Sequence, residues 1–363
     1  MKISQVQADC FRIPLPTVLS DSTHGRITHF QLITVRLRDD EGGEGLGYTY
    51  TVGKGGAAVR SVVAHDLAPS LLHADPRRIE QIWQRMWWQL HYVGRGGIAS
   101  FAISAVDIAL WDLNAKRQGE PLWRFLGGCQ PQVQAYAGGI DLDFTLDQLK
   151  QQTRANLDRG FRAVKMKVGR PRLHEDAERV AAIRDLVGPE ITLMVDANMR
   201  WRVDEAITAA REFRDHDVFW LEEPTIPDDV AGHAKIARQG GLPIAAGENL
   251  HTVYEFRQMI DAGGVAFPEP DVSNIGGITT WLKVAKLAES ANLPITSHGV
   301  HDLHVHLLAA VPNASYLEVH GFGLEPFQKM PLTIVDGAAT APNEPGHGVQ
   351  LLWEALAEHR EPF

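Results

Sequence analysis

Three acidic residues stand at the ends of three apolar segments, at equal intervals along the chain. Asp196 ends ITLMVDAN, Glu222 lies in FWLEEP and Glu248 lies in LPIAAGEN, and 26 residues separate each acid from the next. That interval fits one strand, one returning helix and two short loops, which predicts three successive parallel strands. Adjacent strands lie about 4.8 Å apart, so the three carboxylates should converge at one edge of a sheet. Hard oxygen ligands grouped in this way suit a divalent cation such as Mg²⁺.

The alternation of short apolar strands with helices extends well beyond these three units. Strand ends are expected in eight segments: VQAYAGG, RAVKMKVG, ITLMVDAN, VFWLEEP, LPIAAGE, VAFPEPDVS, LPITSH and SYLEVH. Helical segments lie between them, for example over 145–159, 173–186 and 203–213. Eight such units predict an α/β fold with a modified (β/α)8 barrel of the TIM type over 129–332, rather than an open sheet.

The first 128 residues follow a different pattern. The segments ISQVQADCFRIPL and FQLITVRLRDDEGGEGLGYTYT are rich in strand-forming residues, with a turn at 39–43. From residue 56 to 126 the pattern is helical, and IASFAISAVDIALWDLNAKRQG predicts one long helix. We therefore expect an α+β capping domain over 1–128. A C-terminal segment over 333–363, with the strand-like GVQLL, is expected to pack back on it.

Composition limits the class of function. The chain has 363 residues and a formal net charge of -10, and no basic block stands out, which argues against a nucleic-acid partner. Two cysteines, Cys10 and Cys129, are too few for a disulfide framework and indicate a reducing compartment. No leader with a basic start and an apolar centre opens the chain, and no apolar stretch approaches about 18 residues. We expect a cytoplasmic protein without a membrane span.

Two lysines belong to the second strand of the predicted barrel. Lys165 and Lys167 flank Met166, and because strand side chains alternate, both ammonium groups should face the barrel interior. Two like charges so close, together with partial burial, are expected to lower the pKa of each lysine and to suit one of them as a general base. The alternative is a pair of lysines that extend to solvent from the strand end.

Three further polar residues end the last three predicted strands. Asp271 ends the sixth strand and His298 the seventh, so the aspartate should accept a hydrogen bond from the second ring nitrogen of the histidine. Lysine and histidine would then approach a central substrate from opposite sides. Glu318 ends the eighth strand and is expected to donate a hydrogen bond to a substrate carboxylate if it is held protonated.

The order of these elements resembles a known family. Through KMK (165–167), VDAN (195–198), EEP (222–224), GE (247–248), PD (270–271), SH (297–298) and LE (317–318), the chain is similar to the mandelate racemase subgroup of the enolase superfamily. The resemblance covers almost the whole chain, including the AVDIALWDL helix of the N-terminal domain. It suggests a symmetric homo-oligomer.

The resemblance also implies roles for single residues. One Mg²⁺ would be bound by Asp196, Glu222 and Glu248. Lys167, with Lys165 as its neighbour, would be one base, and the His298/Asp271 pair would be the other. Glu318 would be an acid that faces the substrate carboxylate, and Asn198 a polar active-site residue.

These parts suit removal of a proton α to a carboxylate, because the enediolate that forms needs its added charge met as it develops. The leading prediction is a Mg²⁺-dependent lyase that dehydrates an acid sugar, an aldarate or aldonate, to a 2-keto-3-deoxy acid. The run SHGVHDLHVH looks similar to that of the talarate/galactarate dehydratases. Polar loops over 20–26, 51–56 and 92–97 are expected to close over this small-molecule substrate, and they offer His24, Arg26, Lys54 and Arg95.

Other functions remain open from sequence. A racemase or epimerase of a 2-hydroxy acid would use the same two bases, a Schiff-base aldolase would use Lys167, and a non-catalytic binding protein is the least specific alternative. A zinc site in the run that contains His298, His301, His304 and His306 is disfavoured. Its last three histidines cannot all share one helix face, and neither HExxH nor a cysteine pair accompanies them.

Overall fold

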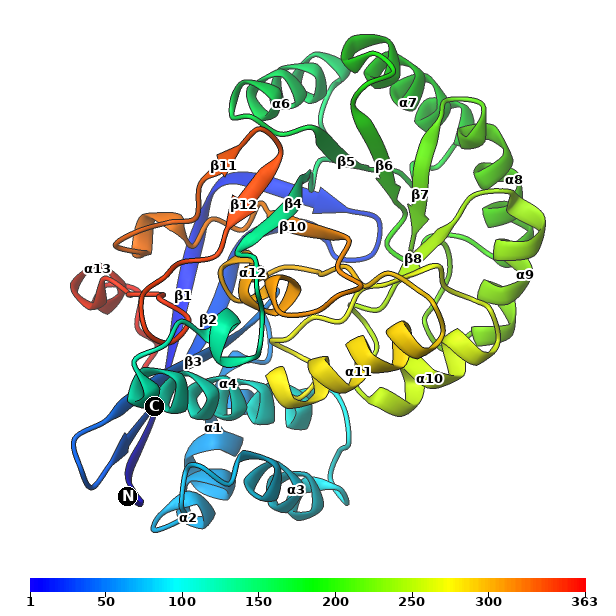
Figure 1. The fold of residues 1–363 in the computed structure, drawn as a ribbon. Coiled ribbons are helices and arrows are strands. Elements are labelled where there is room, and N and C mark those ends of the chain that lie inside the picture. Colours follow the sequence, from blue (N-terminus) through cyan, green and yellow to red (C-terminus); the bar gives the residue numbers. More distant parts are fainter.

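The computed structural model describes residues 1–363 and contains an N-terminal unit and a barrel (Figure 1). The N-terminal unit begins with an antiparallel sheet of β1 (Ile3–Asp21), β2 (Gly25–Asp39) and β3 (Glu44–Thr51). Its helices are α1 (Gly56–Ser61), the π-helical η1 (Val62–Leu67), α2 (Ala68–Leu71), α3 (Ile79–Leu90) and α4 (Ile98–Gln118). The predicted α+β capping unit is therefore present, and α5 (Leu122–Phe125) leads from it into the barrel.

Two glycines bring the long helix α4 close to the capping sheet. A Cβ atom on Gly45 would meet the backbone oxygen of Ala109, and one on Gly47 would meet that of Ala105. Only glycine permits this approach of helix to strand. The helix is thereby held between β3 and the barrel.

The barrel sheet follows the predicted order of strands. Its parallel strands are β4 (Gln132–Gly138), β5 (Ala163–Lys167), β6 (Thr192–Asp196), β7 (Val218–Glu222), β8 (Ile244–Ala246), β9 (Phe267–Pro268) and β10 (Tyr316–His320). Since β10 pairs in parallel with β4, the sheet curls back on itself. The outer ring in Figure 1 comprises α6 (Leu146–Asp158), α7 (Leu173–Val187), α8 (Val203–Arg214), α9 (Val230–Gly240), α10 (Val253–Asp261) and α11 (Ile278–Ser290), and α12 (His301–Ala309) precedes β10.

The predicted seventh strand, LPITSH, is not a strand in the structure. It makes only an isolated bridge between Ile295 and Ala314, and the preceding β9 has two residues. Prolines explain this, because Pro268, Pro270 and Pro294 lack the N–H that a strand ladder needs. The Thr296 N–H still donates to the Pro268 carbonyl at 3.0 Å, so this segment closes the gap between β9 and β10.

The C-terminal segment contacts both units. The hairpin of β11 (Ile334–Val335) and β12 (Ala338–Thr340) adds antiparallel to the first half of β4. Farther on, Arg360 bridges Phe11 of β1, beyond α13 (Trp353–Ala357). The predicted strand GVQLL is reduced to a bridge between Leu351 and Gln328 in the loop that also holds η2 (Glu325–Phe327). The segment therefore packs on the barrel as well as on the capping unit.

Helix α4 is the long helix that the sequence predicts, and it is strongly apolar. It is the one helix whose length and composition suffice to cross a membrane, with a mean hydropathy of 1.3 over its most apolar window, and 83% of that window is buried inside the protein. Burial against the capping sheet and α11 accounts for its apolar character.

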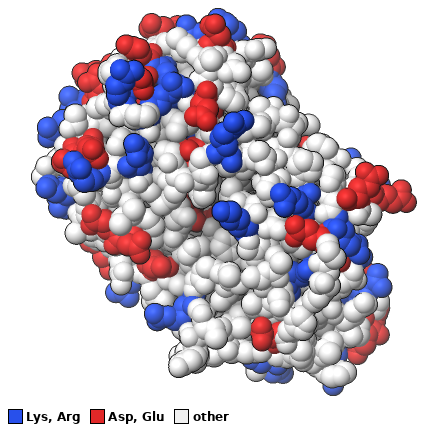
Figure 2. Space-filling model, turned by 180° about the vertical axis from the view of Figure 1, so that it is seen from behind, with Lys and Arg blue, Asp and Glu red and all other residues white.

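Basic and acidic side chains are interspersed on the face shown in Figure 2, and uncharged surface separates them. No extended basic area of the kind that collects phosphates is present on this face. Both cysteines are free thiols, Cys10 buried and Cys129 exposed.

Candidate active site

The three acids of the sequence ladder meet at the carboxyl ends of β6, β7 and β8. Asp196 and Glu222 are register partners in adjacent strands, and Glu248 follows two residues after β8. All three are buried, and each offers a carboxylate oxygen within 4.8 Å of the others. Three buried carboxylates so close together need compensating positive charge, and an all-oxygen donor set fits Mg²⁺. The residues present therefore fit the cation that the sequence predicts.

Below this cluster the barrel is filled by large side chains. Tyr136, Met194 and Trp220 form a separate buried apolar cluster with two alanines. The indole N–H of Trp220 donates to Glu222 at 3.1 Å, and Lys165 donates to the Tyr136 hydroxyl at 3.3 Å. This floor fixes the lower ends of the charged side chains and excludes water from beneath them.

Both lysines of β5 point into the barrel, as alternation along the strand predicts. Lys165 is hydrogen-bonded to Glu222 and lies 2.8 Å from Glu318, while Lys167 is hydrogen-bonded to Asp196. Burial opposes their positive charge, but these carboxylates outweigh it and raise the pKa of both lysines. The expectation of lowered lysine pKa values is therefore wrong for this arrangement, because it counted the neighbouring lysine and not the carboxylates in contact.

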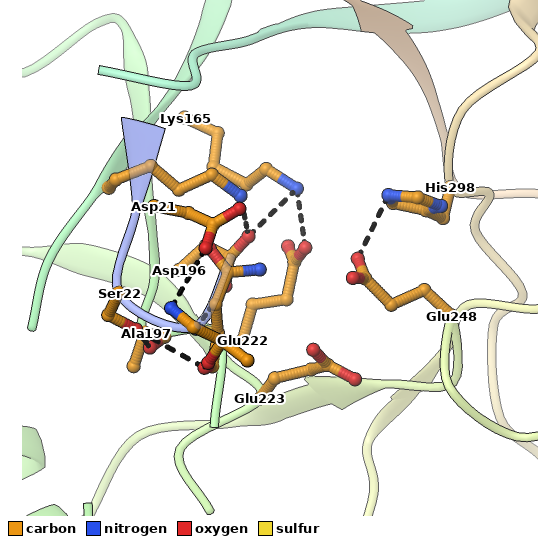
Figure 3. Close-up of polar contacts among 12 residues, drawn as sticks. Asp21, Ser22, Lys165, Asp196, Ala197, Glu222, Glu223, Glu248 and His298 are labelled. Atoms are coloured by element: carbon orange, nitrogen blue, oxygen red, sulfur yellow. Dashed lines mark hydrogen bonds and ion pairs between the residues drawn. The ribbon is translucent and has the colours of Figure 1, made fainter. Parts of the chain in front are cut away.

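His298 faces the carboxylates from the side opposite to Lys165 (Figure 3). Its Nδ1 lies 3.0 Å from Asp271, as the sequence predicts, and its Nε2 lies 2.9 Å from Glu248. Tyr50 of the capping sheet also donates its hydroxyl to Asp271, at 3.2 Å. Burial disfavours the imidazolium, but Glu248 and Asp271 outweigh it and raise the pKa of His298 well above its ordinary value.

Glu318 differs from the prediction in its charge. It was expected to be held protonated, yet its pKa is lowered well below the ordinary value. Burial acts in the opposite direction and is outweighed by Lys165 and His298. The carboxylate also accepts a hydrogen bond from the backbone N–H of Gly299 at 2.8 Å. In this arrangement Glu318 is an anion, so it accepts hydrogen bonds rather than donating one.

The loop between β1 and β2 lies over the end of β6 (Figure 3). Ser22 donates to the carbonyl of Ala197 at 2.7 Å, and Thr23 donates to that of Asn198. Asn198 has a left-handed backbone, with φ at 41°, and its buried side-chain oxygen has no partner. The loop thereby joins the capping unit to the strand end that carries Asp196.

Of the four predicted lid residues, only His24 lies close enough for its pKa to be affected by the charged side chains of the site. Its Nδ1 is 2.9 Å from Asp21, whose hydrogen bond raises the pKa of His24, and the charges of Glu248 and Lys167 also act on it. Arg26, Lys54 and Arg95 are exposed and make no hydrogen bond or ion pair with the cluster. Arg95 instead lines a separate cavity between α3 and α10.

Several residues of the site were missed by sequence reasoning. They share burial next to the predicted residues, and they are Asp21, Tyr50, Glu223, Glu269 and His320. Some signals were present, since Glu223 follows Glu222 directly and His320 lies two positions after Glu318 on the same strand face. Both carboxylate oxygens of the fully buried Glu269 lack a hydrogen-bond partner, and burial raises its pKa well above the ordinary value.

Two further histidines of the SHGVHDLHVH run, His304 and His306, make hydrogen bonds to the backbone. His304 accepts from the Val272 N–H at 3.0 Å and lies 2.8 Å from the Gly299 carbonyl. His306 accepts from the N–H of Trp123 at 3.2 Å. These contacts leave neither ring directed at the carboxylate cluster.

Comparison with known proteins agrees with this geometry. Residues 5–127 match the N-terminal domain of mandelate racemase / muconate lactonizing enzyme, and residues 148–355 match the enolase C-terminal domain-like model. A 3,6-anhydro-alpha-L-galactonate cycloisomerase from Streptomyces coelicolor is 58% identical, over 98% of this chain and 98% of its own.

Two solved structures match nearly the whole chain. A racemase from Streptomyces coelicolor with bound magnesium has a TM-score of 0.97 and 56% identity, and the match covers 99% of this chain and 100% of the other. An L-talarate dehydratase from Polaromonas complexed with Mg and L-glucarate has a TM-score of 0.94 and 35% identity, with 99% and 98% covered. The predicted family and its similarity to acid-sugar dehydratases are confirmed. The chain is an enzyme of the mandelate racemase / muconate lactonizing enzyme family, within the enolase superfamily.

Proposed function

We propose that this enzyme opens a cyclic anhydro acid sugar by Mg²⁺-dependent β-elimination, as a cycloisomerase of the 3,6-anhydro-L-galactonate type. The observation that carries the proposal is the 58% identity, over nearly the whole of both chains, to a cycloisomerase of that substrate. The pairing of Lys165 and Lys167 on one side with His298 on the other supports the same chemistry. The dehydration predicted from sequence thereby becomes the second candidate.

In this proposal Asp196, Glu222 and Glu248 hold the cation. When bound, Mg²⁺ stabilises the charge that develops on the substrate carboxylate and offsets the carboxylates that otherwise hold Lys167 protonated. The chain's own groups perform the proton transfers. Lys167 or His298, whichever faces the proton α to the carboxylate, removes it, and Lys165 keeps positive charge beside the enediolate.

Ring opening conserves all atoms of the substrate. The base removes the proton from C2, the C2–C3 double bond forms and the C3–O bond of the ether breaks. The ether oxygen stays attached through C6 and takes a proton, which histidinium at His298 can supply. The resulting enol becomes a 2-keto-3-deoxy acid when C3 gains a proton, so the product has the formula of the substrate.

Dehydration of an open-chain acid sugar is the same elimination with a hydroxyl as leaving group. It is favoured by the 35% identity to a talarate dehydratase solved with L-glucarate and by the polar Asp21–His24 pair at the mouth. A racemase, such as the magnesium-bound relative from Streptomyces coelicolor, would instead return the proton to C2. We propose a cytoplasmic enzyme for each of these chemistries.

One product analysis separates the candidates. The Mg²⁺-loaded enzyme is incubated with 3,6-anhydro-L-galactonate and, separately, with L-talarate and galactarate, and the products are examined by mass spectrometry and for 2-keto groups. We expect a 2-keto acid of unchanged mass from the anhydro sugar. A product one water lighter from the open-chain acids alone would establish the dehydratase instead, and inverted C2 without a keto group would establish the racemase.

A further inference from the structure

Three potential metal ligands gather next to the carboxylate triad, and His298 is one of them. His298, Glu318 and His320 each offer one nitrogen or oxygen atom, and these atoms lie within 4.8 Å of one another. Glu318 and His320 are two residues apart in β10, so strand alternation puts both side chains on one face. The three side chains come from two neighbouring segments of the barrel mouth, and no single sequence motif contains all three.

His298 is oriented for this role by its surroundings. Its Nδ1 is held by Asp271 at 3.0 Å, and Asp271 is itself bonded by Tyr50 and Ser273. The Nε2 atom therefore faces the carboxylates, 2.9 Å from Glu248 and 4.0 Å from the second carboxylate oxygen of Glu318, so a cation at Nε2 replaces the contact with Glu248. A carboxylate that holds the distal nitrogen of a histidine is the arrangement that orients histidine ligands at zinc sites.

His320 packs against the rings of Tyr50 and Phe322. It is buried, and neither of its ring nitrogens makes a hydrogen bond. Its ring lies edge-on to that of His298, with centroids 5.3 Å apart. Since neither ring nitrogen is hydrogen-bonded, one of them can offer its lone pair to a cation.

We propose that His298, Glu318 and His320 form a second cation site, selective for zinc-like transition metals and adjacent to the Mg²⁺ site. Two imidazoles and one carboxylate are a donor set that zinc prefers and magnesium does not. Zinc–ligand bonds of about 2.0–2.2 Å put tetrahedral donors roughly 3.4 Å apart. Side-chain rotations that move each donor atom by about an ångström would therefore bring the three atoms to zinc-binding distance. Lys165 binds the other oxygen of Glu318 and does not occupy this position.

Occupation of this site blocks the enzyme. A zinc ion displaces the proton from Nε2 into solvent and takes the lone pair with which His298 accepts a proton, so the ion inhibits while Mg²⁺ remains bound. His320 also lines a cavity of about 480 Å³ between β1 and α6, which brings solvent as far as this ligand. The inhibition depends on the proposed catalytic use of His298, whereas the binding does not.

The test measures binding of Zn²⁺ and of Co²⁺, its spectroscopic substitute, to the full-length enzyme in saturating Mg²⁺. We expect calorimetric Zn²⁺ binding and an intense visible Co²⁺ absorption in the wild type, with the dissociation constant raised at least about tenfold in His320→Gln. His301→Gln is the matched control, since His301 is a buried histidine of the nearby helix that contacts Asp302 and Glu325 instead. It should bind zinc as the wild type does.

Two results would overturn the site. Equal Zn²⁺ affinity in the wild type and His320→Gln would exclude His320 as a ligand, and full displacement of Zn²⁺ by added Mg²⁺ would place it at the carboxylate triad. Glu318→Gln, read by binding alone, provides a second ligand variant if His320→Gln folds poorly. If binding follows the prediction but zinc leaves turnover intact, the second site stands and the catalytic role of His298 fails.

Discussion

At the scale of single residues, the site is a balance of buried charges. Glu222 shows this most clearly, because it lies at 0% exposure between Lys165 and the indole of Trp220. Its pKa is raised to about 8 by burial and by the neighbouring acids, although Lys165 acts in the opposite direction. Burial of this carboxylate is unfavourable without a bound positive charge, so we expect Glu222 to be a ligand of the cation.

The first prediction concerns Glu222→Gln. The amide keeps the size of the side chain and one of the two acceptors that face Lys165 and Trp220, but it removes one anionic ligand. The dissociation constant for Mg²⁺ should therefore rise at least about tenfold and turnover should nearly vanish. Magnesium-dependent thermal stabilisation and turnover measure the two effects. Glu178→Gln, an exposed position on α7, is the control and should behave as the wild type. Wild-type turnover by Glu222→Gln after exhaustive chelation would contradict the metal assignment.

A second prediction separates His24 from the other lid residues. The hydrogen bond with Asp21 raises the pKa of His24 and favours its charged form at the mouth, so His24→Gln should raise KM about tenfold for long acid sugars and less for short ones. Lys54→Gln and Arg95→Gln should leave KM unchanged, because neither side chain contacts the cluster. Equal effects on long and short substrates would place His24 outside the substrate site.

Strand alternation was sufficient to predict which residues meet at the mouth, but not their charge states. The direction of Lys165 and Lys167 follows from a period of two along β5. Their pKa values depend on contacts with Glu222, Glu318 and Asp196, which come from other strands. Such contacts are not encoded in local spacing, and the same holds for the low pKa of Glu318.

At the scale of elements, the helices and strands with strong periodicity were predictable, and those rich in proline were not. Helix α6 begins where Thr145 and Gln148 form a capping box, a pattern visible in the sequence. The seventh strand failed because Pro268, Pro270 and Pro294 remove ladder donors in the two segments that should pair. The function of that strand survives, since Ile295 and Thr296 still position His298 through single hydrogen bonds.

The contact of α4 with α11 carries a third prediction. Asp107 is fully buried on α4 and accepts hydrogen bonds from the Thr279 N–H at 2.9 Å and hydroxyl at 2.6 Å. Burial raises its pKa to about 7, although those hydrogen bonds oppose the rise. The folded protein therefore binds a proton that the unfolded chain releases near pH 4, and stability falls as pH rises from about 4 to about 7.

The variant Asp107→Asn removes this ionisation while it keeps an acceptor for Thr279. Relative to the variant, the free energy of unfolding of the wild type should fall by roughly 2–3 kcal/mol between pH 5 and pH 8. Urea unfolding of both proteins at the two pH values measures it. A difference that is the same at both pH values would show that Asp107 does not carry the proton.

At the scale of the whole molecule, the site exists only where the two units meet. The barrel supplies the lysines, the acids and His298, while the capping unit supplies Tyr50 against Asp271 and the loop that covers Asn198. The predicted series of eight βα units was enough to place the site residues of the barrel, because the carboxyl ends of the strands in such a barrel lie on one face. The capping residues could not be assigned in this way, since their loops have no period and their contacts are long-range.

The measurement that tests the central claim most directly is exchange of the α-proton in D2O by Lys167→Ala and His298→Asn. Lys165 and His298 approach the carboxylates from opposite sides, and Lys167 shares the strand face of Lys165. The two variants should therefore show complementary defects on substrates of opposite C2 configuration. On a substrate that presents its proton to Lys167, His298→Asn should still exchange slowly yet form little product, because the proton for the departing oxygen is missing. Wild-type exchange by both variants on every active substrate would contradict the account, since neither residue would then be a base.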